Sequence, residues 1–336
     1  MHTILHNVEK VNQRKWAEFV YHHPRGNIFQ TPEMYEIYLN YPKYDPIVLF
    51  VIDQNKSIQA VLVAVIQKET AGFFGRFSAR SIIWGGPLVD DNNPKIIDMI
   101  LKDYQQLVKK KAVYSQFRNL WDWGEARDIF TQNGFAYEDH LDILFDLNQT
   151  NDELWRQVHK ERRKNIRRAE KKGVTFREIK EKSQITKAYE LLFDTYQRIK
   201  LPLVNESFFL EAWRVLNPPR MIKFFGAFYQ NKLISVRVVL CYKERVYDWY
   251  TGSFFQYRNK YPNDFLPWEI IKWSKQKGYS VFDFGGAGKP GIAYGVRDYK
   301  KKFGGKVLNN GRIIIIHHNM TYKVAELLYK IYRRVK

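Results

Sequence analysis

The chain has 336 residues, of which 45% are hydrophobic and 16% aromatic, so it can bury a sizeable core and is not a disordered protein. At about 150 residues per domain, this length predicts roughly two domains. The single cysteine, Cys241, excludes an intramolecular disulfide and a cysteine-rich zinc cluster. The 55 Lys and Arg residues and 35 Asp and Glu residues give a net charge of +20, which attracts nucleic acid, an anionic membrane face or a phosphorylated substrate.

The chain contains no run of apolar residues that predicts a membrane span. Its longest run of Ile, Leu and Val alone covers residues 313–316, whereas a transmembrane helix needs about 20 apolar residues. The first residues also lack the apolar core of a secretory signal. We therefore expect a cytoplasmic protein.

The first half of the chain predicts helices and strands in a definite order. Thr31 can cap a helix that begins with Pro32, and residues 46–67 read as two strands around a turn at Asn55 and Lys56. In chain order we expect a helix at 11–23, a helix from 31, the strand pair at 46–67, a strand at 81–84, a helix at 93–111 and a strand at 112–120.

The second half predicts the same order. A helix at 151–173, ended by Gly173, precedes a strand at 174–179 and two helices around Ala188 and Phe209. The remaining elements are a strand pair at 221–242, a strand at 245–253, a helix at 263–278 and a strand at 279–286.

Both strand pairs turn at the same tripeptide, Gln-Asn-Lys, at 54–56 and at 230–232. Together with the shared element order, this favours a tandem duplication of one unit. Strands joined by a two-residue turn are antiparallel, which excludes a doubly wound parallel sheet. We expect an α/β (α+β) fold of two tandem domains, each a mixed, largely antiparallel sheet flanked by helices, an order that resembles the GNAT acyltransferase unit.

A glycine-rich segment at residues 282–306 is the strongest local signal for a site. Its strand ends in Gly285 and Gly286, which would let backbone N–H groups approach a ligand closely. It matches neither a Walker A loop nor a dinucleotide fingerprint, and on glycine content alone a surface loop is the favoured alternative.

Tyr299 and Phe303 lie four residues apart, so on a helical turn they share one face and can aim Lys300 at a pocket. A lysine so placed could hold a phosphate or stabilise a developing oxyanion. For Lys301 and Lys302 the favoured alternative is a solvated basic turn.

The helix expected at 151–173 is strongly basic. Trp155, Val158, Ile166 and Ala169 form one apolar stripe at helical spacing, and Arg162 falls within it. A charge on an apolar face must be paired or point into a cavity, so we expect Arg162 in an ion pair or facing substrate. The other cations indicate a solvated face or a polyanion footprint.

The remaining chemical candidates are few. Asp248 and Asp283 each lie in a strand before glycine and are candidate bases, with a lysine-paired carboxylate as the alternative. Cys241 lies in an apolar strand and is expected to be a packed thiol. No HExxH or GxSxG motif occurs, so zinc hydrolysis and serine-elbow chemistry have no support.

Several short motifs run in order along nearly the whole chain. They are residues 26–31 (GNIFQT), 85–88 (GGPL), 163–169 (RKNIRRA) with 173–174 (GV), 250–253 (YTGS), 267–271 (PWEII), 282–286 (FDFGG) and 299–305 (YKKKFGG). On these motifs the chain resembles the Fem family (FemABX) of non-ribosomal peptidyltransferases, which is related to the GNAT acyltransferases.

The resemblance implies two GNAT-like domains, at 1–148 and 149–318, with a C-terminal helix at 319–336 returning to the first. It implies transfer of an amino acid from aminoacyl-tRNA to an amine of a peptidoglycan precursor, with no metal and no tightly bound cofactor. The lysine of the family's late motif falls on Lys300. The coiled-coil arm of some members has no counterpart in this sequence.

We therefore expect Lys300 to be catalytic, with Asp283 and Tyr250 as further candidates. The expected substrate-binding residues are Arg162, Trp249, Gly285, Gly286, Tyr299, Lys301 and Phe303.

Two other functions stay open. Tyr38 and Val204 stand where basic residues gripping a nucleotide-linked muropeptide are expected, which leaves room for an acyl-CoA-dependent N-acyltransferase acting on an amino sugar or another amine. A non-catalytic protein that binds nucleic acid or the inner face of an anionic membrane is the second alternative, because residues 320–336 are amphipathic and basic. Packing of this tail on the first domain is the preferred interpretation.

Overall fold

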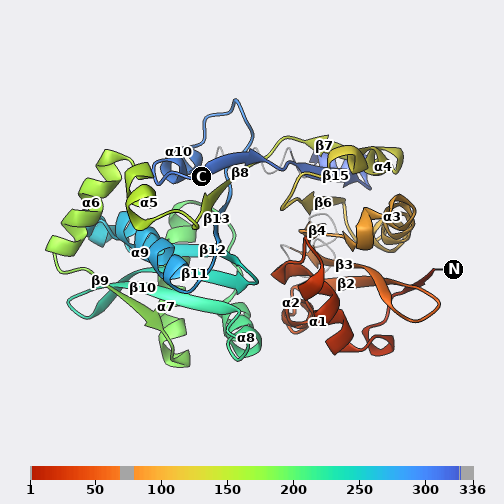
Figure 1. Ribbon diagram of the computed structural model, residues 1–336, viewed down its shortest axis with the longest axis horizontal. Coiled ribbons are helices and arrows are strands. Elements are labelled where there is room, and N and C mark those ends of the chain that lie inside the picture. Colours follow the sequence, from red (N-terminus) through yellow and green to blue (C-terminus); the bar gives the residue numbers. More distant parts are fainter. Residues whose placement is uncertain (1, 69–78, 325, 327–336) are drawn as a thin grey trace. The chain divides into compact units, whose positions relative to one another are not determined.

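Two mixed β-sheets, each flanked by helices, make up the computed structural model, which describes residues 2–68, 79–324 and 326 (Figure 1). The described chain divides into two compact units. Unit 1 contains the residues up to Asp139 and those from Asn310 onward, and unit 2 contains His140–Asn309. The expected α/β class with two mixed, largely antiparallel sheets is confirmed.

The sheet of unit 1 has the strand order β1-β2-β3-β4-β6-β15-β7, with β5 paired to β3. Only β4 and β6 pair in parallel among these described strands. The strands are β1 (Thr3–Leu5), β2 (Tyr44–Ile52), β3 (Ile58–Gln67), β4 (Arg80–Trp84), β5 (Leu88–Val89), β6 (Tyr114–Arg118), β7 (Ala136–Glu138) and β15 (Arg312–Ile316). The α-helices are α1 (Gln13–His22), α2 (Pro32–Leu39), α3 (Pro94–Val108) and α4 (Arg127–Gln132).

Local signals explain where these helices begin. Thr31 caps α2, with its side chain accepting from Met34 N–H and Pro32 at the first position, as expected. Asn93 caps α3 in the same way, and the apolar face of α3 packs on β2 and β3. In the core Tyr104 is fully buried and its hydroxyl bonds the side chains of Ser81 and Ser115, which satisfies the polar atoms of both strands.

The sheet of unit 2 has the order β14-β8-β13-β12-β11-β10-β9, and β12 and β13 form its parallel pair among the described residues. The strands are β8 (Leu141–Asp146), β9 (Thr175–Ile179), β10 (Ile222–Tyr229), β11 (Lys232–Tyr242), β12 (Arg245–Ser253), β13 (Val281–Gly286) and β14 (Lys306–Asn309). The α-helices are α5 (Asn151–Gln157), α6 (Lys160–Lys171), α7 (Lys182–Arg198), α8 (Glu206–Leu216), α9 (Pro262–Gln276) and α10 (Gly295–Lys301).

The two units share the expected order of elements. In each, three successive antiparallel strands precede a helix and then a strand that returns parallel to the third, through α3 in unit 1 and α9 in unit 2. The Gln-Asn-Lys tripeptide forms the turn both times, and Lys56, Gln230 and Asn231 have positive φ. Both α7 and α9 pack against β11 and β12.

The units divide at residues 139/140 and 309/310, rather than at the expected 148/149 and 318/319. β8 pairs with β13 and β14, which places it in unit 2, and β15 pairs with β6 and β7, which places it in unit 1. The C-terminal helix is described at residues 319–324, where Tyr322 packs edge-on against Tyr114 at 5.5 Å. The amphipathic stretch at 327–336 lies outside the described residues.

The prediction of a single helix at 151–173 is wrong, because the chain forms two helices, α5 and α6, with a break between them. Val158 and His159 have extended backbones there. His159 caps α6 through its side chain, and its N–H donates to Lys302 O at 2.8 Å. Val158 is 1% exposed, so the break still buries the apolar residue that the stripe predicted.

No helix in the described part of the chain combines the length and apolar character needed to cross a bilayer. The longest α-helix there, α7, has 17 residues, so no coiled-coil arm interrupts the described part of unit 2.

Candidate active site

At the centre of the sheet of unit 2, the parallel strands β12 and β13 pair over only part of their length. β12 and β13 pair from Arg245 to Tyr247, whose partner is Asp283, but both strands continue beyond this point. On its other edge β12 carries a bulge, which leaves Trp249 without a partner in β11. A bulge bends its strand, and the pairing of β12 with β13 ends just before this bulge. The backbone carbonyl groups of β13 that follow Asp283 can therefore bond another partner.

That partner is Lys300, near the end of α10. Its Nζ donates to the carbonyl oxygen of Phe284 at 2.5 Å and to that of Gly286 at 2.9 Å. An ammonium group has three donors, so one N–H remains for a ligand. Burial lowers the pKa of Lys300, and the nearby carboxylate of Asp248 opposes this effect.

Tyr299 holds α10 in place next to this lysine. Its hydroxyl donates to the carbonyl oxygen of Asn263, and Arg237 donates to the same hydroxyl at 3.3 Å. The guanidinium carbon of Arg162 lies 4.9 Å from the centre of the ring, within cation–π range. Burial raises the pKa of Tyr299 to about 12, so the phenol is a neutral donor near pH 7.

Phe303 completes the anchor that the sequence predicted. It is fully buried and packs on Tyr299 at 5.3 Å and on Phe284 at 5.6 Å, measured between ring centres. The spacing of Tyr299 and Phe303 thus fixes the orientation of Lys300.

A buried ion pair lies beside the lysine. Arg237 and Asp248 are paired, with side chains that are 5% and 7% exposed. Asp248 Oδ1 has no hydrogen-bond partner among the described residues, although it is buried. Asp248 is therefore paired to an arginine, not to the lysine that the sequence suggested.

Asp283 is also buried and engaged through both oxygens. Oδ1 accepts from Gly285 N–H at 2.7 Å, and Oδ2 lies 3.4 Å from Arg245. Burial raises the pKa of Asp283, and the Arg245 charge opposes the shift. Because Gly285 N–H is occupied, the expectation that it faces a ligand is wrong for this structure, and at Gly286 it is the carbonyl that meets Lys300.

Arg162 forms the ion pair that its place on the apolar stripe predicted. It pairs with Asp264 in the first turn of α9, and Asn165 donates to the same carboxylate at 2.8 Å. Burial raises the pKa of Asp264, and the charge of Arg162 opposes the shift. The pair ties α6 to α9 beneath Tyr299.

The other expected residues lie in different surroundings. Trp249 packs on Phe208 at 5.6 Å and Tyr250 on Phe209 at 4.9 Å, so both belong to an aromatic cluster with α8. Lys301 is exposed.

Cys241 is 3% exposed and burial raises the pKa of its thiol to about 12, as expected for a packed cysteine. In the described ranges no cluster of three or more His, Cys, Asp or Glu side chains could hold a metal ion.

Sequence reasoning missed Arg237 and Asn263. A signal for Arg237 exists, because it is the single charge within the apolar run 233–241, and a charge there must be paired. Asn263 acts through its backbone carbonyl, which no residue type predicts.

Comparison with known proteins shows a GNAT-type domain in unit 2. Residues 156–301 match the family model described as an acetyltransferase (GNAT) domain, a span that includes Arg162, Arg237 and Lys300. No curated protein matches the chain in sequence.

Solved structures share the fold over nearly the whole chain. A crystal structure of FemX is similar over 96% of this chain and 99% of that chain, with 15% identity and a TM-score of 0.72. The C-terminal domain of a putative lysylphosphatidylglycerol synthetase from Agrobacterium fabrum covers 94% of this chain and 95% of its own, with 13% identity and a TM-score of 0.57. A tandem GNAT protein from the clavulanic acid biosynthesis pathway covers 94% and 99%, with 9% identity and a TM-score of 0.59.

The chain therefore has a Fem-type fold of two GNAT-like units. Within unit 2, residues 156–301 match an acetyltransferase (GNAT) domain.

Proposed function

We propose that the chain is an amide-forming aminoacyltransferase, which moves an amino acid from aminoacyl-tRNA to an amine of a peptidoglycan precursor in the cytoplasm, at the inner face of the membrane. The FemX-like fold and the Fem-type motifs around Lys300 support this reaction. The likeness to a lysylphosphatidylglycerol synthetase domain and the net charge of +20 agree with an aminoacyl-tRNA donor.

The observation that carries the proposal is the placement of Lys300. Its ammonium group is fixed by two carbonyl oxygens and has one donor left. A preorganised, partly buried cation stabilises negative charge that develops on a carbonyl oxygen better than water does. These contacts support the proposal that Lys300 binds the oxyanion of a tetrahedral intermediate.

The chemistry balances without a protein base. The acceptor amine attacks the ester carbonyl, a C–N bond forms, and the C–O bond to the tRNA ribose breaks. The amine loses a proton and the departing ribose oxygen gains one. Because both oxygens of Asp283 are engaged, we propose that this proton passes through the substrates themselves, and that positioning supplies much of the rate.

An acyl-CoA-dependent N-acyltransferase acting on an amino sugar or another amine is the second candidate, which the acetyltransferase domain match favours. A diphosphate of such a donor binds well at a helix N-terminus preceded by a glycine-rich loop. Helix α9, whose Asn263 accepts a hydrogen bond from Tyr299, has Asp264 in its first turn and follows residues 254–261, which contain no glycine. The N-terminus of α9 therefore lacks the glycine-rich approach that a diphosphate uses, which supports aminoacyl-tRNA as the donor.

The donor is tested directly with labelled substrates. The protein is incubated with a radiolabelled aminoacyl-tRNA or with radiolabelled acetyl-CoA, each with a UDP-linked peptidoglycan pentapeptide or with glucosamine. We expect label to move only from aminoacyl-tRNA to the pentapeptide. Transfer from acetyl-CoA alone would establish the second candidate, and transfer from neither donor to either acceptor would contradict both.

The role of Lys300 is tested with Lys300→Met. We expect transfer to fall at least about a hundredfold, as for loss of an oxyanion donor, while circular dichroism and thermal unfolding stay close to wild type. Lys187→Met removes an exposed lysine of α7 and is the matched control. Undiminished transfer by the Lys300 variant would remove this residue from the mechanism.

A further inference from the structure

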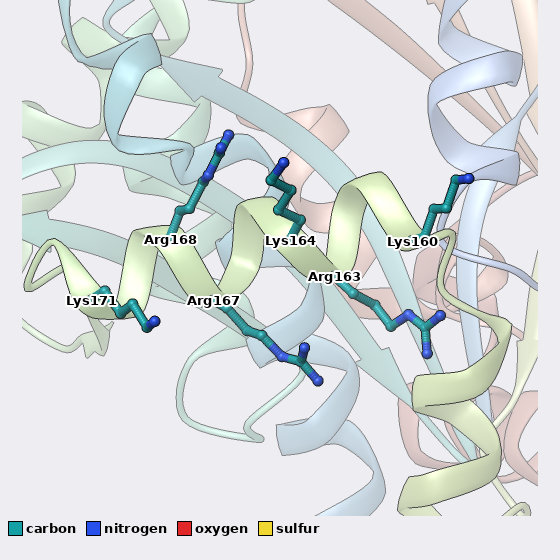
Figure 2. Close-up of a pocket in the computed structure, with 6 residues that line it drawn as sticks. All are labelled: Lys160, Arg163, Lys164, Arg167, Arg168 and Lys171. Carbon is teal, nitrogen blue, oxygen red and sulfur yellow. The ribbon is translucent and has the colours of Figure 1, made fainter.

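Helix α6 concentrates positive charge on its exposed side. Seven of its 12 residues are Lys or Arg. Arg162 points inward to Asp264, and the other six line a shallow groove of about 490 Å³ along the helix (Figure 2). The six are Lys160, Arg163, Lys164, Arg167, Arg168 and Lys171.

No carboxylate of the described chain forms an ion pair with these six cations. Of the acids of α6 and its partner helix, Glu161 pairs with Lys302 and Asp264 with Arg162, and Glu170 of α6 forms no ion pair with the six cations in the described chain. Surface cations in proteins are commonly interspersed with acids. Six cations without an ion-pair partner on about three helical turns, with Glu161 and Glu170 as the acids of the same helix, favour an anionic partner from outside the described chain.

Aromatic rings hold two of the guanidinium groups in place. Arg167 lies 5.5 Å from the ring centre of Trp155, and Arg168 lies 5.7 Å from that of Tyr261 and donates to its hydroxyl at 3.4 Å. Such contacts reduce the side-chain entropy lost when a ligand binds.

We propose that α6 binds the phosphate backbone of a polynucleotide along this groove. The cations form two rows with four-residue spacing, which fan out to the two sides of the helix axis in Figure 2. One row is Lys160, Lys164 and Arg168, and the other is Arg163, Arg167 and Lys171. A four-residue step along a helix is about 6 Å, similar to the separation of successive phosphates along a nucleic-acid strand.

The shape and composition of α6 favour a polynucleotide over other anions. A helix that binds a membrane surface inserts apolar side chains, but the apolar residues of α6, Ile166 and Ala169, are fully buried. A compact phosphate would meet only part of a row that runs over about 16 Å of helix. A strand with many phosphates can use all six charges.

The same helix supports the candidate active site from its inner side. Arg162 reaches Tyr299, the neighbour of Lys300, and Glu161 pairs with Lys302 at 2.8 Å. The inference deepens the proposed function, on which it rests for the identity of the RNA: the donor tRNA would lie on α6 while its aminoacyl end reaches Lys300. Binding itself is measurable without any transfer.

The test is the affinity of a fluorescein-labelled RNA hairpin with a single-stranded 3′ end, measured by anisotropy at several salt concentrations. In the triple variant Arg163→Gln, Arg167→Gln, Lys171→Gln we expect binding to weaken about tenfold or more, and the slope of log K against log salt to fall by about 2–3. The control Lys95→Gln, Lys109→Gln, Lys110→Gln removes three exposed charges from unit 1 and is expected to bind within twofold of wild type.

Three outcomes would overturn the proposal. The first is equal weakening by both triple variants, which would show diffuse attraction by net charge. The second is unchanged RNA binding by the α6 variant. The third is selective loss of binding to phosphatidylglycerol vesicles, which would assign the face to a membrane. If the triple variant misfolds, Lys164→Gln replaces it, with an expected loss of slope of about 1.

The Lys300→Met variant separates this inference from the proposed function. We expect it to bind the hairpin like wild type while transfer is lost. Continued transfer by Lys300→Met, together with loss of RNA binding by the α6 variant, would refute the chemistry and leave the binding face intact.

Discussion

At the residue scale, the surroundings of Lys300 hold its ammonium group in one position without neutralising its charge. Carbonyl oxygens, not a carboxylate, accept its hydrogen bonds. Of the carboxylates near it, Asp248 and Asp283 are each paired to an arginine. The ammonium group therefore keeps one N–H donor for a ligand. Away from bulk water the effective dielectric constant is lower, so its attraction to a negative charge is stronger there.

Asp283 makes stability depend on pH in a defined direction. Burial raises its pKa in the folded state, so the folded protein binds this proton more readily than the unfolded chain. Its contribution is fully present below the ordinary aspartate pKa and is lost as pH rises through the raised value. Each unit of raised pKa corresponds to about 1.4 kcal/mol.

We therefore expect the stability of wild type relative to Asp283→Asn to increase as pH falls from 7.5 toward about 4. The asparagine keeps an acceptor for Gly285 N–H and does not titrate. Urea unfolding of both proteins at each pH gives the difference. A difference that stays constant with pH would show that Asp283 titrates alike in both states.

At the scale of elements, α6 and α9 are joined by the pair of Arg162 and Asp264. The sequence predicted that Arg162 needs a partner, since it falls on an apolar stripe. It did not predict the partner, because Asp264 lies about a hundred residues away on another helix. The break at Val158 and His159 was missed for the same reason, since the bond from His159 N–H to Lys302 joins distant segments.

Removal of one partner of this pair is expected to cost more than removal of both. Arg162→Met leaves the Asp264 carboxylate buried without its charge partner and should lower the free energy of unfolding by about 3 kcal/mol. The double variant Arg162→Met, Asp264→Leu removes both charges and should recover more than half of that loss. Urea unfolding measures both. A double variant less stable than the single one would show that the pair is needed for packing.

At the scale of the whole molecule, the chain is one α/β unit inserted into another of similar design. The sequence predicted the duplicated order and the antiparallel strand pairs, because short turns and hydrophobic alternation are local signals. The predicted unit boundaries lie about nine residues after the observed ones. The unit to which β8 or β15 belongs depends on the strands that it pairs with, which the residues of β8 and β15 themselves do not indicate. The packing of Tyr299 with Phe303 was predicted because their spacing is a local signal. The contact of Arg237 with Tyr299 was not predicted, because it joins residues that are far apart in the sequence.

Unit 2 is expected to fold when it is produced alone as residues 140–309. Its two ends are neighbours, since Leu141 pairs with Asn309 and His140 N–H donates to Asn309 Oδ1 at 3.0 Å. It also has its own core of buried residues between Ile143 and Phe303. Circular dichroism should show one cooperative urea transition. A gradual transition with strong binding of a hydrophobic dye would contradict an independent unit.

In the proposed mechanism Lys300 stabilises the transition state and contributes little to binding of the donor. The most direct measurement compares two quantities in wild type and Lys300→Met: the single-turnover rate of transfer from aminoacyl-tRNA, and the Kd for a stable amide-linked aminoacyl-RNA. We expect the rate to fall at least about a hundredfold while the Kd stays within about twofold, as for loss of a group that binds only the oxyanion. An unchanged rate, or a Kd that weakens as much as the rate falls, would contradict the account.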